Sequence, residues 1–175
     1  MICRCQSSRV YLSQISDIYQ PKTISSLELK IDGKYDVFGA NGIIGKYSEY
    51  NHKTPQICLT CRGNTCGTIN YSNPFSWITG NAMVINVDNH SNEVNKRFLY
   101  HYLTMMNFAK YISGSGQPQI VREPLQKLLI SLPSMAEQIK IASNLDAYVN
   151  RIRLEQRILN LYQSQKEYLL RTMFI

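Results

Sequence analysis

The feature that most constrains this chain is a stretch without glycine or proline that runs from Ser134 to Phe174. Ser134 is followed three residues later by Glu137, which is the spacing of a capping box and predicts the start of a helix. A helix of about 40 residues is about 60 Å long, far longer than the helices of ordinary small domains. Two shorter helices folded back on the domain are the alternative, but no turn residue marks a break. We therefore predict one projecting helix over 134–175 and a separate domain over 1–133.

The apolar residues of this predicted helix form a stripe that drifts around it and is not a clean heptad seam. A small domain cannot cover a stripe of this length, so the helix is expected to pack against another long helix. The side chains expected at that contact are Leu145, Val149, Ile152, Leu159, Tyr162 and Leu169.

The part of the chain between Tyr35 and Val87 has a β pattern. Short apolar runs over 35–38, 57–59, 69–71 and 82–87 alternate there with clusters of Gly, Asn, Ser and Pro, which is typical of short strands joined by loops. Asn41-Gly42 is a strong signal for a hairpin turn. We expect a small, irregular β-rich half with many loops.

Helical patterns lie on both sides of this β-rich part. We expect a strand over 10–12, a helix over 13–19, and another helical turn over 25–31. Apolar residues at spacings of three and four predict a helix over 95–109, followed by a loop, a short helical segment over 124–129 and a short strand over 130–133. The predicted fold class is α+β: a small loop-rich β/α domain followed by one long helix.

The composition favours an anionic partner. The chain has 175 residues, enough for one sizeable core, with a formal net charge of +7 and a pI of about 9.2. This basic balance favours nucleic acid ahead of membrane, although the charge is spread out and a generic basic surface is the alternative. No segment is apolar enough to span a membrane, and the N-terminus lacks the apolar core of a signal peptide. We expect a cytoplasmic protein with reduced cysteines.

The sequence shows no catalytic constellation. Cys58, Cys61 and Cys66 are too closely spaced for a four-cysteine zinc ribbon, and buried core positions explain them better. Asn73-Pro74-Phe75 resembles the loop with which amino-methyltransferases hold a flipped base, but a second proline and a methyl-donor motif are missing, so a turn is favoured. No nucleotide-binding, hydrolase or metalloprotease motif occurs. We predict no metal and no cofactor.

Three polar loops have the composition of a nucleic-acid contact. Arginine reads guanine, Asn and Gln read adenine, and glycine-rich loops offer backbone amides to phosphates. Each of these residues taken singly fits an ordinary solvated loop, so it is the combination of three loops in a basic chain that carries the prediction. The candidate DNA-binding residues are Lys46, Tyr47, Asn51, Lys53, Arg62, Asn64, Ser115, Gln117, Gln119 and Arg122.

Five motifs in order resemble one family. They are YDVFGANGIIGKYSEYN at 35–51, the Arg-Gly…Gly turn at 62–67, FSWIT at 75–79, SGSGQPQ at 113–119 and ISLPSMAEQIKIA at 130–142. Together they resemble the specificity subunit of type I restriction-modification systems. Each motif alone is weak, but the series covers nearly the whole chain.

The resemblance implies a DNA-reading role without catalysis. Members of this family carry two target recognition domains and two long helices, and this chain has one of each, as in a half-subunit or one half of a longer protein. The domain would read one part of a bipartite site on double-stranded DNA. The helix would pair antiparallel in a coiled coil and set the spacing of the half-sites, while methyltransferase and restriction subunits would supply the chemistry. Two identical chains would form a homodimer that reads inverted half-sites.

The sequence departs from the family pattern at a few positions. Asp36 replaces the usual proline, and the three cysteines stand where aliphatic or small residues are common. The bases that are read stay open. Two other functions remain as alternatives: the recognition part of a fused methyltransferase-nuclease, and an interaction adaptor whose DNA-binding loops have decayed.

Overall fold

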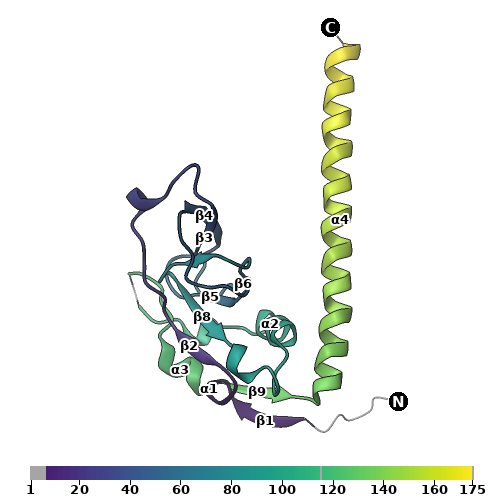
Figure 1. Cartoon of the computed structure of the whole chain (residues 1–175). Helices are drawn as coiled ribbons and strands as arrows, with labels where there is room; N and C mark the ends of the chain where they lie inside the picture. Colours follow the sequence, from purple (N-terminus) through teal and green to yellow (C-terminus); the bar gives the residue numbers. More distant parts are fainter. Residues whose placement is uncertain (1–6, 115, 175) are drawn as a thin grey trace, which may run out of the picture.

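The computed structural model describes residues 7–114 and 116–174, and it shows a mixed globule from which one long helix projects (Figure 1). The predicted α+β class is confirmed. The strands are β1 (Ser8–Tyr11), β2 (Asp17–Tyr19), β3 (Tyr35–Gly39), β4 (Gly42–Tyr47), β5 (Ile57–Thr60), β6 (Ile69–Tyr71), β7 (Trp77–Ile78), β8 (Ala82–Asn86) and β9 (Leu129–Leu132). The helices are α1 (Leu12–Ile15), α2 (Lys96–Thr104), α3 (Arg122–Gln126) and α4 (Met135–Met173), with 3₁₀ turns η1 (Ser26–Glu28), η2 (Asp88–His90) and η3 (Ala109–Tyr111).

A four-stranded antiparallel sheet in the order β2-β8-β5-β6 forms the middle of the globule. All four residues of β5 are buried, which is why this strand is a continuous apolar run rather than an alternating one. Ile57 and Leu59 point into the main core, where the helices pack, whereas Cys58 points to the opposite face. The sheet is therefore covered on both sides.

Helices α1, α2 and α3 contribute to the main core. Leu12 and Ile15 from α1, Leu99 and Leu103 from α2, and Leu125 from α3 are all at most 1 % exposed and belong to one cluster. The β1–β9 pair ties the start of the described chain to the strand that leads into α4. The base of the long helix is thus anchored to the main core.

A second sheet in the order β4-β3-β7 covers the other face. Phe38 from β3 and Ile78 from β7 pack with Cys58, Ala82 and Val84 of the central sheet. The predicted hairpin is confirmed: β3 and β4 pair antiparallel around the tip at 40–41, and Gly42 has a φ of 121°, which glycine adopts at little cost.

Two sequence-based helix predictions need correction. The helix expected over 13–19 is only the short α1, and its second half is strand β2, because Ile18 pairs with Ile85 at the edge of the central sheet. The helix expected over 95–109 ends at Thr104, and a separate turn, η3, begins at Ala109. Tertiary pairing overrides local periodicity at the first site. Strand β7 lies in a segment for which no strand was predicted.

The long C-terminal helix is confirmed as one uninterrupted element of 39 residues. Ser134 is its N-cap, and its hydroxyl accepts a hydrogen bond from the backbone N–H of Glu137. The alternative of two shorter helices is wrong. Only Gln138 and Ala142 of the described part of α4 are buried, so the helix touches the globule at its base and projects away from it (Figure 1).

Candidate nucleic-acid interface

The structure brings three loops together at one edge of the central sheet. Arg62 pairs with Gln119 in a short β-bridge, and the Gly63 N–H donates to the Pro118 carbonyl at 3.0 Å. The hairpin tip joins the same edge, because the Asn70 amide donates to the Ala40 carbonyl at 3.1 Å. We call this group of loops, 40–41, 61–68 and 113–119, the Arg62 corner. Of the predicted DNA-binding residues, the corner holds Arg62, Asn64, Gln117 and Gln119, all exposed.

One further predicted residue lies beside this loop series. Arg122 is the first residue of α3 and is exposed three positions after Gln119. Ser115 lies outside the described residues. Within the 113–119 loop, Ser113 and Gln119 exchange backbone hydrogen bonds of 2.8 and 2.9 Å, which closes the loop at its base. The loop is therefore presented on a fixed stem next to Arg62.

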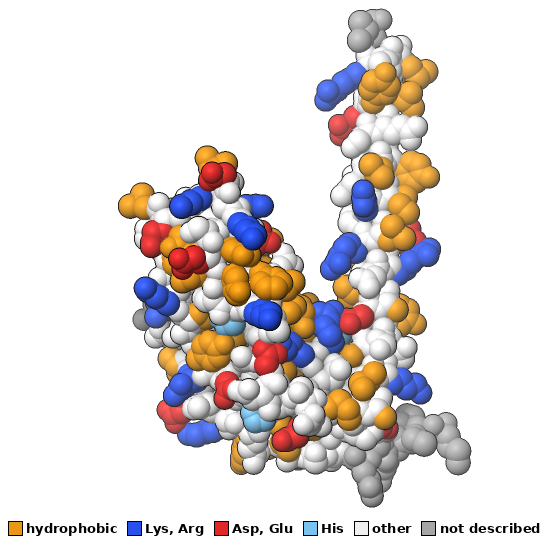
Figure 2. Space-filling model, viewed as in Figure 1, with side chains coloured by type: hydrophobic (Ala, Val, Ile, Leu, Met, Phe, Trp, Pro, Cys, Tyr) orange, Lys and Arg blue, Asp and Glu red, His pale blue; other side chains and the backbone are white. Residues whose placement is uncertain are grey.

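The other predicted residues lie at the open end of the β3–β4 hairpin. Lys46 is exposed on β4, and Tyr47 next to it makes an edge-on contact with Trp77, with 5.3 Å between ring centroids. A second aromatic series runs from Tyr35 through Tyr50 to Phe75, with centroid distances of 4.9 and 5.3 Å. We call these rings the aromatic patch; its members are Tyr35, Tyr47, Tyr50, Phe75 and Trp77. Figure 2 shows Lys and Arg side chains among hydrophobic ones over this upper part of the globule.

Asn51 has a positioning role that the sequence did not reveal. Its amide donates to the Ile78 carbonyl at 2.9 Å and accepts from the Ile78 N–H at 2.8 Å. The same Asn51 oxygen lies 2.6 Å from Nδ1 of His52, so Nδ1 carries the proton, and Nε2 is left to accept from the Tyr19 hydroxyl at 2.8 Å. Burial lowers the pKa of His52, in keeping with a neutral ring. Asn51 thereby holds the loop that carries Lys53.

Phe75 is a candidate contact residue that sequence analysis placed in a turn and in the FSWIT motif but not among the DNA-binding residues. Its φ is 53°, the one positive φ of a non-glycine residue in the described chain, and this costs a bulky residue about 1–3 kcal/mol. Its ring is nevertheless 42 % exposed. The Phe75 N–H donates to the Lys53 carbonyl at 3.2 Å, which links the turn to the basic loop. Pro74 before a residue of positive φ is the order of a type II turn, and this was the available sequence signal.

Of the three described cysteines, Cys58 and Cys61 are buried in the core, and Cys66 is partly buried against it. Cys58 and Cys61 lie in different core clusters, on opposite faces of the sheet. Burial raises the pKa of the Cys58 thiol to about 12 and raises that of Cys61 as well, so both stay protonated, whereas zinc binds thiolates. Among the described residues, no group of three His, Cys, Asp or Glu side chains is placed to hold a metal ion. The same residues contain no helix apolar and long enough to cross a membrane.

The junction between globule and long helix is built from polar contacts. The buried Gln138 amide accepts from the Asn95 N–H at 2.8 Å and donates to the carbonyls of Glu93 and Pro133 at 3.1 and 3.0 Å. One turn beyond Ala142, Asp146 accepts from Nε of Arg97 at 3.0 Å. That hydrogen bond, reinforced by the charge of Arg97, lowers the pKa of Asp146. These bonds fix the direction in which α4 leaves the globule.

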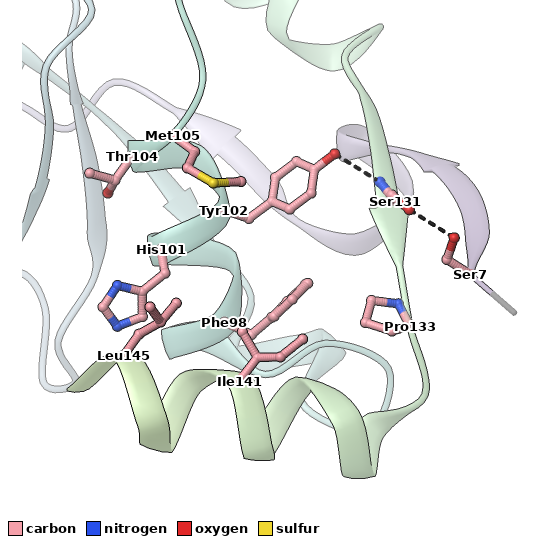
Figure 3. A pocket seen from close by; sticks show the side chains of 10 residues that line it. All are labelled: Ser7, Phe98, His101, Tyr102, Thr104, Met105, Ser131, Pro133, Ile141 and Leu145. Atoms are coloured by element: carbon pink, nitrogen blue, oxygen red, sulfur yellow. Dashed lines mark hydrogen bonds between the residues drawn. The ribbon is translucent and has the colours of Figure 1, made fainter. Parts of the chain in front are cut away.

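An apolar pocket lies beside this junction. Its volume is about 590 Å³, and it is lined by residues of α2, of the first turns of α4 and of the segment around β9 (Figure 3). Figure 3 shows His101 beside Leu145 and Phe98 beside Ile141, with Met105 across the opening. His101 Nε2 lies 2.7 Å from Asp146, so this histidine has a structural role. The pocket presents no catalytic group and is a candidate contact surface.

Comparison with known proteins identifies the family. Residues 8–162 match the model of the type I restriction modification DNA specificity domain. The chain belongs to this family. It is 31 % identical over 122 residues to a type I restriction enzyme specificity subunit of Haemophilus influenzae, covering 68 % of this chain and 31 % of that protein. It is 33 % identical over 114 residues to the EcoprrI specificity subunit of Escherichia coli, covering 65 % of this chain and 28 % of that subunit.

Solved structures share the fold. The S subunit of a type I restriction-modification system from M. genitalium superposes with a TM-score of 0.77 at 17 % identity, covering 87 % of this chain and 41 % of that one. The HsdS subunit from Thermoanaerobacter tengcongensis gives a TM-score of 0.58 at 18 % identity, covering 86 % and 39 %. This specificity domain thus spans about a third of the length of its curated relatives and about two fifths of these structures.

Proposed function

We propose that this specificity domain binds double-stranded DNA sequence-specifically, reads one part of a bipartite site and performs no catalysis itself. The observation that carries the proposal is the Arg62 corner, where loops far apart in sequence pair Arg62 with Gln119 and where Gln117 is exposed two residues before Gln119. These residue types match guanine and adenine in the major groove. The net charge of +7 supplies the attraction to the phosphate backbone.

The size of the β3–β4 hairpin suits a half-site. The corner meets the hairpin tip, and the aromatic patch lies at its open end, where Tyr35 pairs with Tyr47. Strand β3 has five residues, so the two groups are separated by roughly 17 Å along it. At 3.4 Å per base step, this separation equals about five base pairs. We infer that the corner and the patch contact neighbouring parts of one half-site, with Lys46 and Lys53 directed to phosphates.

The decisive experiment compares two single-charge losses. The target duplex is first selected from a random pool with the wild-type chain. Arg62→Ala is then expected to weaken binding to that duplex by about 1–3 kcal/mol and to relax the base preference of the protein, with little change in binding to random DNA. Arg9→Ala, an exposed charge loss on β1, is the matched control and should leave the preference unchanged. Binding is measured by fluorescence anisotropy at several salt concentrations. Equal weakening on both duplexes would assign Arg62 to a phosphate and overturn its base-reading role.

We also propose that α4 pairs antiparallel with α4 of a second copy, so that the target is two inverted half-sites. The predicted pairing residues, from Leu145 to Leu169, are all between 36 % and 66 % exposed. A second apolar stripe, formed by Leu154, Ile158, Leu161 and Tyr168, lies on another side of the helix. This stripe supports the proposal that methyltransferase and restriction subunits assemble on the helix pair. Sedimentation across a concentration series tests the homodimer.

A further inference from the structure

The apolar pocket at the base of α4 is continuous with an apolar seam along the helix. Ile141 and Leu145 line the pocket and are also the first two positions of that seam. The apolar stripe of α4 as a whole drifts, but one subset of positions keeps spacings of four and three, as the core positions of a coiled coil do, with Glu155 and Lys166 as its two charged members and Val149 beside it. The members of this seam are Ile141, Leu145, Tyr148, Ile152, Glu155, Leu159, Tyr162, Lys166, Leu169 and Met173. The pocket therefore lies at the lower end of this seam.

We propose that this pocket is the socket for the last turn of α4 from a second copy of the chain. The inference rests on the dimer proposed above and adds its register. With a two-fold axis beside Arg157, every seam position faces another seam position of the partner. The partner's Met173 then lies opposite Ile141, and the partner's Leu169 lies opposite Leu145. Because the pairing is symmetric, both pockets are filled at once.

The end of α4 has the chemistry that the socket requires. Leu169, Leu170, Met173 and Phe174 are between 45 % and 80 % exposed, so the last turns form an uncovered apolar tip. On the other wall of the socket, Met105 of α2 is 82 % exposed. Methionine side chains adapt to irregular apolar contacts, which suits Met173 against Met105. Covering these groups removes two apolar surfaces from water in one step.

The two charged residues of the seam are compatible with this register. Lys166 faces the partner's Tyr148, whose ring accepts a cation over its face. Glu155 faces the partner's Leu159 and keeps its ion pair with Arg151 one turn earlier on its own helix, at 2.5 Å. No two like charges face each other along the seam.

A register shifted by one heptad is the main competitor. The shifted register would place Glu155 opposite the partner's Lys166. Met173 would then lie opposite the partner's Tyr148, and the pocket would remain exposed to solvent. An exposed ion pair contributes less than the burial of large apolar side chains such as Ile141 and Met173. The geometry therefore favours the register that fills the socket.

The test begins with Met105→Asp, followed by sedimentation velocity across a concentration series. Met105 is the C-cap residue of α2 and lies outside the paired helices, and because it is 82 % exposed the substitution should lower the melting temperature only slightly, through the negative charge at a helix C-terminus. We expect the dimer dissociation constant to rise about tenfold or more, because a charge would enter an apolar contact. Met173→Asp should have the same effect. Tyr168→Asp is the matched control: it is 67 % exposed in the same last turns but off the seam, and should change the constant little.

A charge-swap series then distinguishes the registers. Glu155→Lys and Lys166→Glu are made singly and together. In the proposed register their effects are additive, whereas recovery of the dimer in the double variant would show the shifted register and overturn the socket. A dimer that tolerates Met105→Asp would also overturn the socket while leaving the proposed homodimer intact. A wild-type chain that stays monomeric would instead overturn the homodimer itself.

Discussion

The globule and the long helix use the same kinds of side chain in opposite ways. In β5 every residue is buried, whereas along the described part of α4 the leucines, isoleucines and tyrosines beyond the base are all at least 36 % exposed. The globule obtains its stability from its own two cores. The helix is also rich in apolar residues, but beyond its base they are not covered by any of the described residues. The comparison teaches that the globule buries its apolar side chains internally, whereas the helix leaves its apolar side chains exposed, which is the basis for the pairing proposed above.

The contrast between globule and helix is tested most directly by making the same substitution, leucine to alanine, in both regions. Leu99→Ala in the main core should lower the free energy of unfolding by about 2–5 kcal/mol, since Leu99 is fully buried and its removal leaves a cavity. Leu159→Ala on α4, where the residue is 49 % exposed, should leave the unfolding of the globule unchanged and weaken only the proposed dimer. Urea unfolding, followed by tyrosine and tryptophan fluorescence at low protein concentration, measures both. Equal losses would show that α4 and the globule unfold as one unit.

The junction should give an intermediate effect. Gln138→Ala removes a buried amide that satisfies the Asn95 N–H and two carbonyls, and we expect a loss of about 1–3 kcal/mol. Hydrogen exchange should show faster opening of the first turns of α4 and the start of α2. Gln156→Ala on the exposed part of the same helix is the control. A Gln138→Ala variant as stable as the wild type would show that water replaces these bonds.

The smallest expected effect is the pH dependence of the stability of the globule that arises from the buried His52. Because burial lowers the pKa of His52 below its ordinary value of 6.5, folding favours the neutral ring. The unfolded chain binds the proton more readily, so this contribution is fully present above pH 6.5 and is lost as the pH falls through and below that value. Melting curves between pH 8 and pH 5.5 should therefore show a steeper decline for the wild type than for His52→Gln. If the melting temperature falls equally with pH in the two proteins, His52 does not contribute to the pH dependence of stability.

Sequence analysis predicted the local features of both regions well. The hairpin at Asn41-Gly42 and the helix start at Ser134 depend on backbone preferences of a few adjacent residues, and both are present. The failures lie where distant segments compete for the same residues: 17–19 is a strand only because β8 offers an edge to pair with. The sequence did not show the roles of Asn51 and Gln138 for the same reason. Asn51 bonds to Ile78, 27 residues away, and Gln138 bonds to Asn95 and Glu93, 43 and 45 residues away.

The candidate interface shows the same division. Residue types and loop composition selected Arg62 and Gln119, but only the fold shows that these two are neighbours and that Lys46 and Tyr47 lie at the opposite end of the hairpin. Phe75 became a candidate only through its positive φ and its exposed ring.

By itself, the sequence determined the long helix, its cap, the β-rich half and the family, because these depend on periodicity and on short motifs that need no distant partner. The tertiary structure decided the two-sided covering of the central sheet, the union of three loops in the Arg62 corner and the open pocket at the base of α4. These depend on hydrogen bonds and burial between segments far apart in the chain, whose pairing is selected only when the whole core forms.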